Sequence, residues 1–220
     1  MTISNTERDS LIREFERSFH TVQLMRVWVD DETHAVNVKA HEIMLRVKKR
    51  IPIKMGLVQG RFSCNGCELE TLENAPHTVT DNFACYNNLL ESLVGGPQSV
   101  GSQSMGGGTY SCSGNFLKNF EGAPQDFEGY FVAVKQLGTG LESVDGLPPN
   151  ARLVDITYQK HLPMLKLLKQ KQVNIRTSLT GELMTDITDI LNDHAPHGPE
   201  GIISCAFKLI KAGFKGSAKL

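Results

Sequence analysis

A period of 21 residues runs through the middle of the chain and constrains its fold more than any other feature. Phe62, Phe83 and Tyr110 each stand two positions before a cysteine. The second aromatic follows the first by 21 residues, and the third follows the second by 27, which is one period plus an insertion of six within residues 102–107. Each aromatic is followed at fixed distances by two large apolar residues and a proline: Leu69, Leu72, Pro76; Leu90, Leu93, Pro97; Leu117, Phe120, Pro124. Such self-similarity indicates stacked structural repeats.

The repeats extend beyond these three units in both directions. A fourth unit begins at Phe131, with Ala133 in place of the cysteine, and leads after two extra residues to an apolar segment at 154–156. Before the first unit, Ile43, Ile51 and Val58 keep the same phase and form a degenerate unit. The sequence therefore predicts repeats over residues 41–158, with four clear units from about residue 60. Residues 1–40 and 159–220 are predicted to cap the two ends.

The repeat core resembles that of leucine-rich repeat proteins, L-x-x-L-x-L-x-x-N/C-x-L. Three units fit this pattern: Phe62-x-Cys64-x-x-Cys67-x-Leu69, Phe83-x-Cys85-x-x-Asn88-x-Leu90 and Tyr110-x-Cys112-x-x-Asn115-x-Leu117. The fourth departs from it, with Gln136 and Gly138 in the Asn and Leu positions. The run 60–76 is similar to the short repeats, about 21 residues long, of many tailed-phage proteins. The resemblance implies an α/β fold, a short leucine-rich-repeat solenoid with a parallel β-sheet on its concave face, and a phage-encoded chain; it implies no catalytic activity.

In a repeat of this kind the aromatic–x–Cys segment is a short strand, and alternate side chains point to opposite faces. Phe62 and Cys64 are therefore expected to face inward and to stack on their counterparts in the next units. Buried cysteine packs as a small hydrophobe, so we interpret Cys64-x-x-Cys67 as packing rather than as a metal or redox motif. Asn88 and Asn115 stand where the chain leaves the strand, and are expected to bond backbone groups that the turn leaves unpaired.

The outward-pointing side chains of the strands form the candidate binding surface. Solenoids use such faces to bind extended partners, and Tyr and Arg are enriched in the energetic centres of interfaces. The residues predicted to contact a protein partner on the concave face are Arg61, Ser63, Asn82, Tyr86, Ser111, Tyr130, Val132, Asp155 and Tyr158. Tyrosines on strands also reflect β-propensity alone, so this alternative stays open. The leading hypothesis is a non-enzymatic protein-binding module; the others are a virion or phage-assembly structural protein, and a host-directed effector or enzyme without a recognisable motif.

The two ends have the patterns of caps. Leu11, Phe15 and Phe19 form one apolar stripe of an N-terminal helix that begins near an N-cap at Thr6, and residues 22–29 and 35–38 are expected to form a hairpin. Three helices are predicted after the repeats, over residues 162–171, 183–191 and 202–211, the last ended by Gly213. The segment His194-Ala-Pro-His197, which with Asp186, Asp189 and Asp193 could suggest a metal site, is interpreted as a loop, because Pro196 interrupts the helix that such histidine ligands would need.

Composition narrows the function classes further. The 23 Lys and Arg nearly balance the 24 Asp and Glu, which argues against nucleic-acid or anionic-membrane coating as the main role. After Glu200 only lysines carry charge, at 208, 211, 215 and 219, and we expect a solvated helix end rather than a nucleic-acid contact. Cys205 lacks the Cys-x-Asp of effector ligases that carry similar repeats. No cofactor, metal, signal peptide or membrane span is expected, so the predicted location is the host cytoplasm or the virion.

Overall fold

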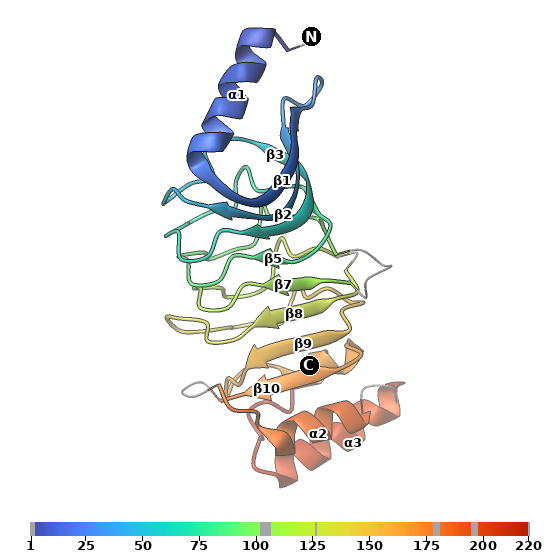
Figure 1. The fold of residues 1–220 in the computed structure, drawn as a ribbon. Helices are drawn as coiled ribbons and strands as arrows, with labels where there is room; N and C mark the ends of the chain where they lie inside the picture. Colours follow the sequence, from blue (N-terminus) through green and yellow to red (C-terminus); the bar gives the residue numbers. More distant parts are fainter. Residues whose placement is uncertain (1–2, 102–106, 126, 178–180, 195–197, 220) are drawn as a thin grey trace.

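The computed structural model describes residues 3–101, 107–125, 127–177, 181–194 and 198–219. Its strands stack one above another into a solenoid of about six turns, with helices at both ends (Figure 1). In chain order the elements are α1 (Asn5–Ser18), β1 (Phe19–Val29), β2 (Val36–Leu45), β3 (Met55–Ser63), β4 (Thr78–Val79), β5 (Phe83–Ala84), β6 (Ser99–Val100), β7 (Thr109–Ser111), β8 (Tyr130–Ala133), β9 (Leu153–Thr157), the 3₁₀ helix η2 (Met164–Lys169), β10 (Val173–Arg176), α2 (Thr185–His194) and α3 (Gly198–Lys211).

One period of sequence adds one turn to the stack. The sheet runs β1-β2-β3-β5-β7-β8-β9-β10, antiparallel between β1 and β2 and parallel from β2 onward. Phe62 pairs in register with Phe83, and the series continues through Tyr110 and Phe131 to Val154. The register confirms the predicted phase of the repeats. Residues 102–106, most of the insertion, lie outside the described residues.

A second, shorter ladder lines an adjacent side of the coil. Strand β4 pairs in parallel with residues 57–58 of β3, and β6 pairs with β4. Strand β3 serves both ladders because it bends at Gly60, whose φ is +141°. A side chain at Gly60 would place its Cβ 1.8 Å from the backbone oxygen of Ala40, so only glycine fits this corner.

The inward aromatic side chains form a continuous stack along the axis of the coil. Ring centroids are separated by 6.0 Å between Phe62 and Phe83, 4.9 Å between Phe83 and Tyr110, and 5.4 Å between Tyr110 and Phe131. These rings are almost completely buried, as is Phe120, which packs edge-on against Phe131. A single repeat cannot bury its apolar face by itself. Each turn is therefore stabilised by the rings of the turns next to it.

Asparagine side chains join successive turns where the chain leaves each strand. The backbone N–H of Leu69 donates to Oδ1 of Asn88 at 3.0 Å, and Nδ2 of Asn88 donates to the carbonyl oxygens of Cys64 at 2.9 Å and Cys85 at 3.0 Å. Asn115 repeats these bonds one turn further on. Gln136, expected to be an exception, accepts from the N–H of Leu117 and donates to the carbonyl of Cys112 in the same way. The longer amide therefore substitutes for asparagine in the fourth unit.

The N-terminal cap contains the predicted helix and hairpin, but the helix ends at Ser18, so Phe19 begins β1 instead of completing the helical stripe, and β2 continues to Leu45. The helix begins at Asn5, and the N-cap is Ser4 rather than Thr6, because the Ser4 hydroxyl accepts the N–H of Glu7 at 3.2 Å. The ring of Phe15 stacks on Phe19 at 5.1 Å, and Phe19 lies 6.0 Å from Phe62. The helix and the hairpin β1–β2 therefore cover the open end of the aromatic stack.

The C-terminal segment differs from the predicted set of three helices. Residues 162–171 contain a short 3₁₀ helix, η2, and the strand β10 follows it as one further turn of the sheet. Two α-helices come next, and Gly213, with φ of +93°, follows α3 as expected. Side chains of α2 cover the free edge of β10: Asn192 bonds both the N–H and the carbonyl of Val173, and Thr188 accepts the N–H of Ile175. The sheet edge is closed by these bonds rather than by packing alone.

Candidate functional site

The side chains that point away from the core along β3, β5, β7, β8 and β9 form one surface, here called the outer sheet face. The described helices lie at the two ends of the stack, so this part of the sheet has no helix across it (Figure 1). Its largest exposed side chains are Tyr86, 39% exposed, and Tyr130, 41% exposed. Between them lie Ser111 and Val132, which are in register and half-buried. The rings of Tyr86 and Tyr130 therefore stand on either side of a region of the face that carries shorter side chains.

The tyrosines differ in how they are held. Tyr86 follows β5, and its backbone N–H donates to Oδ1 of Asn65 at 3.1 Å, which fixes the backbone and leaves the ring in solvent. The guanidinium of Arg152 lies 5.8 Å from the ring centroid of Tyr130, within the range of a cation–π contact. Arg152 was not among the predicted site residues. The sequence could have indicated Arg152, because it directly precedes Leu153, which the repeat phase places opposite Tyr130.

Arg61 and Ser63 lie on the outer sheet face as predicted, and both have neighbours there. Nε of Arg61 donates to the carboxylate of Asp81 at 3.1 Å, in an ion pair that solvent reaches. The hydroxyl of Ser63 accepts from Nδ2 of Asn65 at 2.8 Å. A partner that binds Arg61 must therefore compete with Asp81.

Three of the predicted residues do not offer a free side chain. Asp155 is only 6% exposed, because Arg176 on β10 covers its carboxylate. Tyr158 lies on the opposite side from the outer row, with its ring packed edge-on against Phe214 at 5.7 Å. Asn82 is half-buried, and its Oδ1 accepts the N–H of Thr109 at 2.8 Å. The open part of the face is therefore shorter than predicted and ends at β8.

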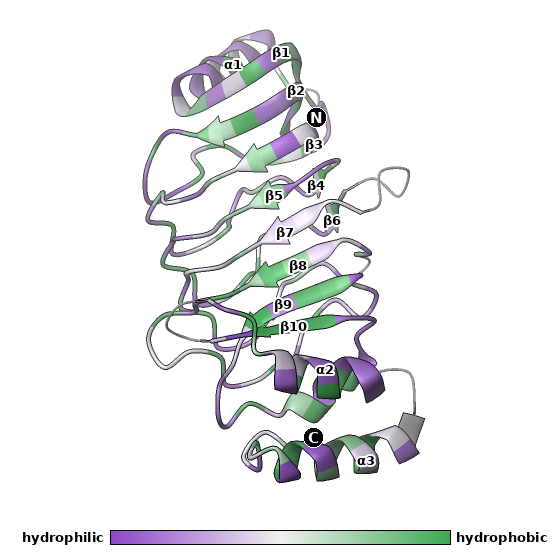
Figure 2. Cartoon of the chain, turned by 60° about the horizontal axis from the view of Figure 1, so that its bottom comes forward, coloured by the Kyte–Doolittle hydropathy of each residue, from purple (hydrophilic) through white to green (hydrophobic). Residues whose placement is uncertain are grey.

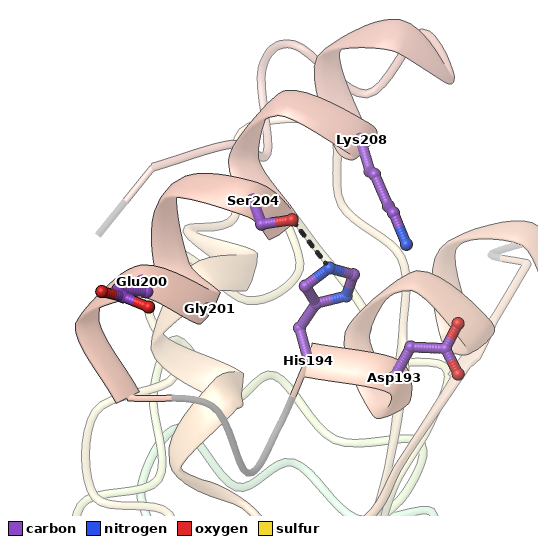
Figure 3. A pocket seen from close by; sticks show the side chains of 6 residues that line it. All are labelled: Asp193, His194, Glu200, Gly201, Ser204 and Lys208. Atoms are coloured by element: carbon purple, nitrogen blue, oxygen red, sulfur yellow. Dashed lines mark hydrogen bonds between the residues drawn. The ribbon is translucent and has the colours of Figure 1, made fainter.

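A second candidate site is the pocket between α2 and α3 (Figure 3). It encloses about 450 Å³ and is lined by Asp193, His194, Glu200, Gly201, Ser204 and Lys208. His194 ends α2, where the sequence predicted a loop, and residues 195–197 lie outside the described part. Its Nδ1 lies 2.7 Å from the carbonyl oxygen of Ile190, and its Nε2 lies 3.2 Å from the hydroxyl of Ser204.

This contact has the donor–acceptor pattern of a nucleophile and its base. Nδ1–H donates to the carbonyl of Ile190, so Nε2 is left to accept the Ser204 hydroxyl proton. The same bond also has a structural role, because it ties α3 to the end of α2. His194 is buried whereas Ser204 is exposed, so the serine contributes more of the pocket surface than the imidazole does.

The five cysteines are all buried thiols. The thiols of Cys64 and Cys112 point to carbonyl oxygens of the next turn, at 3.6 Å and 3.7 Å. Burial raises the pKa of Cys64, Cys85 and Cys112 well above the usual value, and raises that of Cys205 to about 11. Their packing role agrees with the sequence interpretation. Within the described residues, no three His, Cys, Asp or Glu side chains are grouped closely enough to hold a metal ion.

Comparisons with protein-family models, curated proteins and solved structures give no significant match to this chain. In the described part of the chain, every helix is too short or too polar to cross a bilayer. The class that the geometry itself defines is an α/β solenoid of stacked repeats, in which a mainly parallel sheet is closed by helices at both ends.

Proposed function

We propose that this chain is a leucine-rich-repeat protein, phage-encoded, that binds another protein through its outer sheet face and performs no catalysis. The observation that carries the proposal is the pair of exposed rings, Tyr86 and Tyr130, on a part of the sheet that none of the described helices crosses. The buried amides of Asn88 and Asn115 support the leucine-rich-repeat type, because they bond backbone groups of adjacent turns at the position where that repeat has asparagine.

Binding would rest on shape and on two aromatic anchors. Each tyrosine offers a large, stiff ring with a hydroxyl at its end, so it buries apolar area at small entropic cost. Ser111 and Val132, between the rings, leave room for a partner side chain or strand. Arg61 would add a charged contact at the N-terminal end of the face, once it exchanges Asp81 for an acidic group of the partner.

The test is affinity capture from lysates of infected cells, with the wild-type chain and a Tyr86→Ala/Tyr130→Ala double variant as baits. The matched control is Leu89→Ala/Leu137→Ala, which removes two comparably exposed apolar side chains outside the strands. The expected result is one protein enriched by the wild type and the control, and reduced at least tenfold with the tyrosine variant. Equal enrichment by the tyrosine variant would contradict the use of this face.

The second candidate is a structural protein of the virion or of phage assembly, which would use the same solenoid as packing. Its support is the uniform, closely stacked interior, which gives the coil a fixed shape. Fractionation separates the two functions: a structural protein co-sediments with purified particles in constant ratio, whereas a binding module remains with its partner in the soluble fraction.

The enzymatic alternative has one supporting observation, the contact between Ser204 and His194. A serine activated in this way would react with a fluorophosphonate probe, and Ser204→Ala would abolish the labelling. We expect no labelling of the wild-type chain, because the described contact is accounted for by the attachment of α3 to α2.

A further inference from the structure

The last helix, α3, has an apolar stripe on the face that points away from the body of the protein. Ile203, Phe207 and Ile210 are 75%, 69% and 48% exposed. The opposite side of the helix carries Cys205 and Leu209, which are completely buried. Figure 2 shows this helix at the end of the stack, with apolar and polar positions alternating along it. Three large apolar side chains on an outward face indicate an interface, since monomers rarely leave such a row in water.

The spacing of the stripe is that of a helix–helix seam. Positions 203, 207 and 210 follow the i, i+4, i+7 pattern, which gives a narrow row of the kind that pairs with another helix. Phe207 lies near its centre, with one isoleucine on each side. The row reads isoleucine, phenylalanine, isoleucine in either direction along the helix. A second copy of the helix that runs antiparallel therefore presents the same order of side chains and fits the row.

Charge on the flank of the stripe adds a second, independent match. Glu200 and Lys211 are both exposed, and they lie eleven residues apart on α3. At 3.6 residues per turn, eleven residues are close to three full turns, so both side chains project from the same flank at opposite ends of the stripe. About a twofold axis near Phe207, Glu200 of one copy lies within reach of Lys211 of the other, and the two pairs form together.

We propose that α3 is a homodimerisation surface, on which a second copy of this chain docks with its own α3 antiparallel. Phe207 would pack against Phe207 of the partner subunit, and Ile203 against Ile210 of the partner subunit. Such an interface is isologous: the same patch is used on both subunits, and the assembly closes at two. The proposal is independent of the outer sheet face, and it leaves that face open on both subunits.

A lipid surface is the main competing occupant, because lysines predominate at this end of the chain. The placement of the charges favours the second copy. Glu200 and Lys208 both line the pocket between α2 and α3 (Figure 3). By helical phase Glu200 also borders the stripe, next to Phe207, and places a negative charge there, whereas Lys208 projects further round the helix. An interfacial helix would instead be expected to border its apolar face with cations. An acid and a base at opposite ends of one flank suit a self-complementary pair.

The seam is short, which sets the expected affinity. A helix of 14 residues spans about 21 Å. The area it covers is well below the roughly 800 Å² per partner of a typical stable complex. The dimer is therefore expected to be reversible, with a dissociation constant in the micromolar range, and to depend on protein concentration.

Sedimentation equilibrium of the full chain, from about 5 to 500 µM, tests the proposal. The wild type is expected to change from monomer to dimer over this range, and Phe207→Ser to remain monomeric. Glu200→Lys and Lys211→Glu are each expected to weaken the dimer at least tenfold, because each turns two attractions into two repulsions. The double reversal Glu200→Lys/Lys211→Glu is expected to restore it. Circular dichroism checks that these surface variants stay folded.

Three results would overturn the proposal. A wild-type chain that is monomeric at 500 µM excludes the dimer, and binding of that monomer to phosphatidylserine vesicles would assign the stripe to lipid instead. A dimer that survives Phe207→Ser places the interface elsewhere. A double reversal as weak as the single variants excludes the antiparallel register.

Discussion

Arg176 and Asp155 join the last two strands of the sheet through one buried carboxylate. Nε of Arg176 donates to the two oxygens of Asp155 at 2.7 and 2.9 Å, and Nη2 donates to Oδ2 at 2.7 Å. The two residues lie on adjacent turns: Asp155 pairs in register with Asn174, and Arg176 stands two residues further along β10. This pair ends the outer sheet face on the C-terminal side.

Replacement of Arg176 by alanine should lower the stability of the fold, because it removes the ion pair between the last two strands. In Arg176→Ala the carboxylate of Asp155 loses its cation and is only partly uncovered to solvent, so part of the cost of an unpaired buried charge remains. Because the Arg176 side chain is itself one-third exposed, we expect a loss of about 1–3 kcal/mol in the free energy of unfolding rather than the full cost of a buried pair. Urea denaturation measures it. The control is Lys166→Ala, which breaks a solvent-exposed ion pair with Asp145 and should change stability by less than about 0.5 kcal/mol.

The amide of Asn88 should be among the most sensitive positions in the chain. Asn88→Ala leaves the N–H of Leu69 and the carbonyl of Cys64 without their partner inside the coil, whereas the carbonyl of Cys85 keeps its bond from Asn115. Since each unsatisfied buried group costs about 1–3 kcal/mol, we expect a loss of at least about 2 kcal/mol. Asn119→Ala, which removes only a local bond to the N–H of Glu121, is the control. Similar urea midpoints for the two variants would contradict the role of the amide.

Tyr110→Phe should stabilise the protein. The Tyr110 hydroxyl is fully buried and has no hydrogen-bond partner among the described residues. Burial accordingly raises the pKa of this phenol well above its usual value. Phenylalanine, found at this position in three other turns, removes the unpaired group, and a gain of about 1 kcal/mol is expected. A lower urea midpoint for the variant would mean that the hydroxyl has a partner.

Alkaline pH should destabilise the fold through the stacked thiols. Burial raises the pKa of Cys64, Cys85 and Cys112, so the folded chain retains protons that the unfolded chain releases near pH 9. Stability is therefore complete below about pH 8 and falls as the pH rises above 9, by up to about 1.4 kcal/mol per pH unit for each thiol. Urea midpoints at pH 8, 9 and 10 measure the slope. Cys85→Ala should make the slope shallower, and an unchanged slope would show that this thiol does not contribute.

The repeat made most of the sheet predictable, because its period carries both the order of the strands and the direction of each side chain. Phe62, Cys64 and Asn88 all lie where the phase predicts them. Strand β10 was missed since the period shortens to 19 residues between Val154 and its partner Val173. The regular spacing that identified the other turns is absent there.

Other features depend on contacts that are distant in sequence. Within the predicted helix 162–171 only Met164–Lys169 is helical, and it is a 3₁₀ helix. The N–H groups of Met164 and Leu165 donate to the carbonyls of Ser217 and Lys219, more than 50 residues away in sequence. In the same way Phe214 covers Tyr158, and no local pattern indicates this pairing. For the candidate site, the sequence therefore located the outer row but not the segments that cover part of it.

The distance between Ser63 and Asn174 tests the solenoid most directly. Both are half-buried, Ser63 on β3 of the outer sheet face and Asn174 on β10, and the register links them through Ala84, Ser111, Val132 and Asp155. Five steps of about 4.8 Å place their backbones about 24 Å apart. Nitroxide labels on Ser63→Cys/Asn174→Cys, measured by double electron–electron resonance, should give a single distribution near this value, with the buried native thiols unlabelled. A broad distribution, or one centred beyond 35 Å, would contradict the stack of repeats.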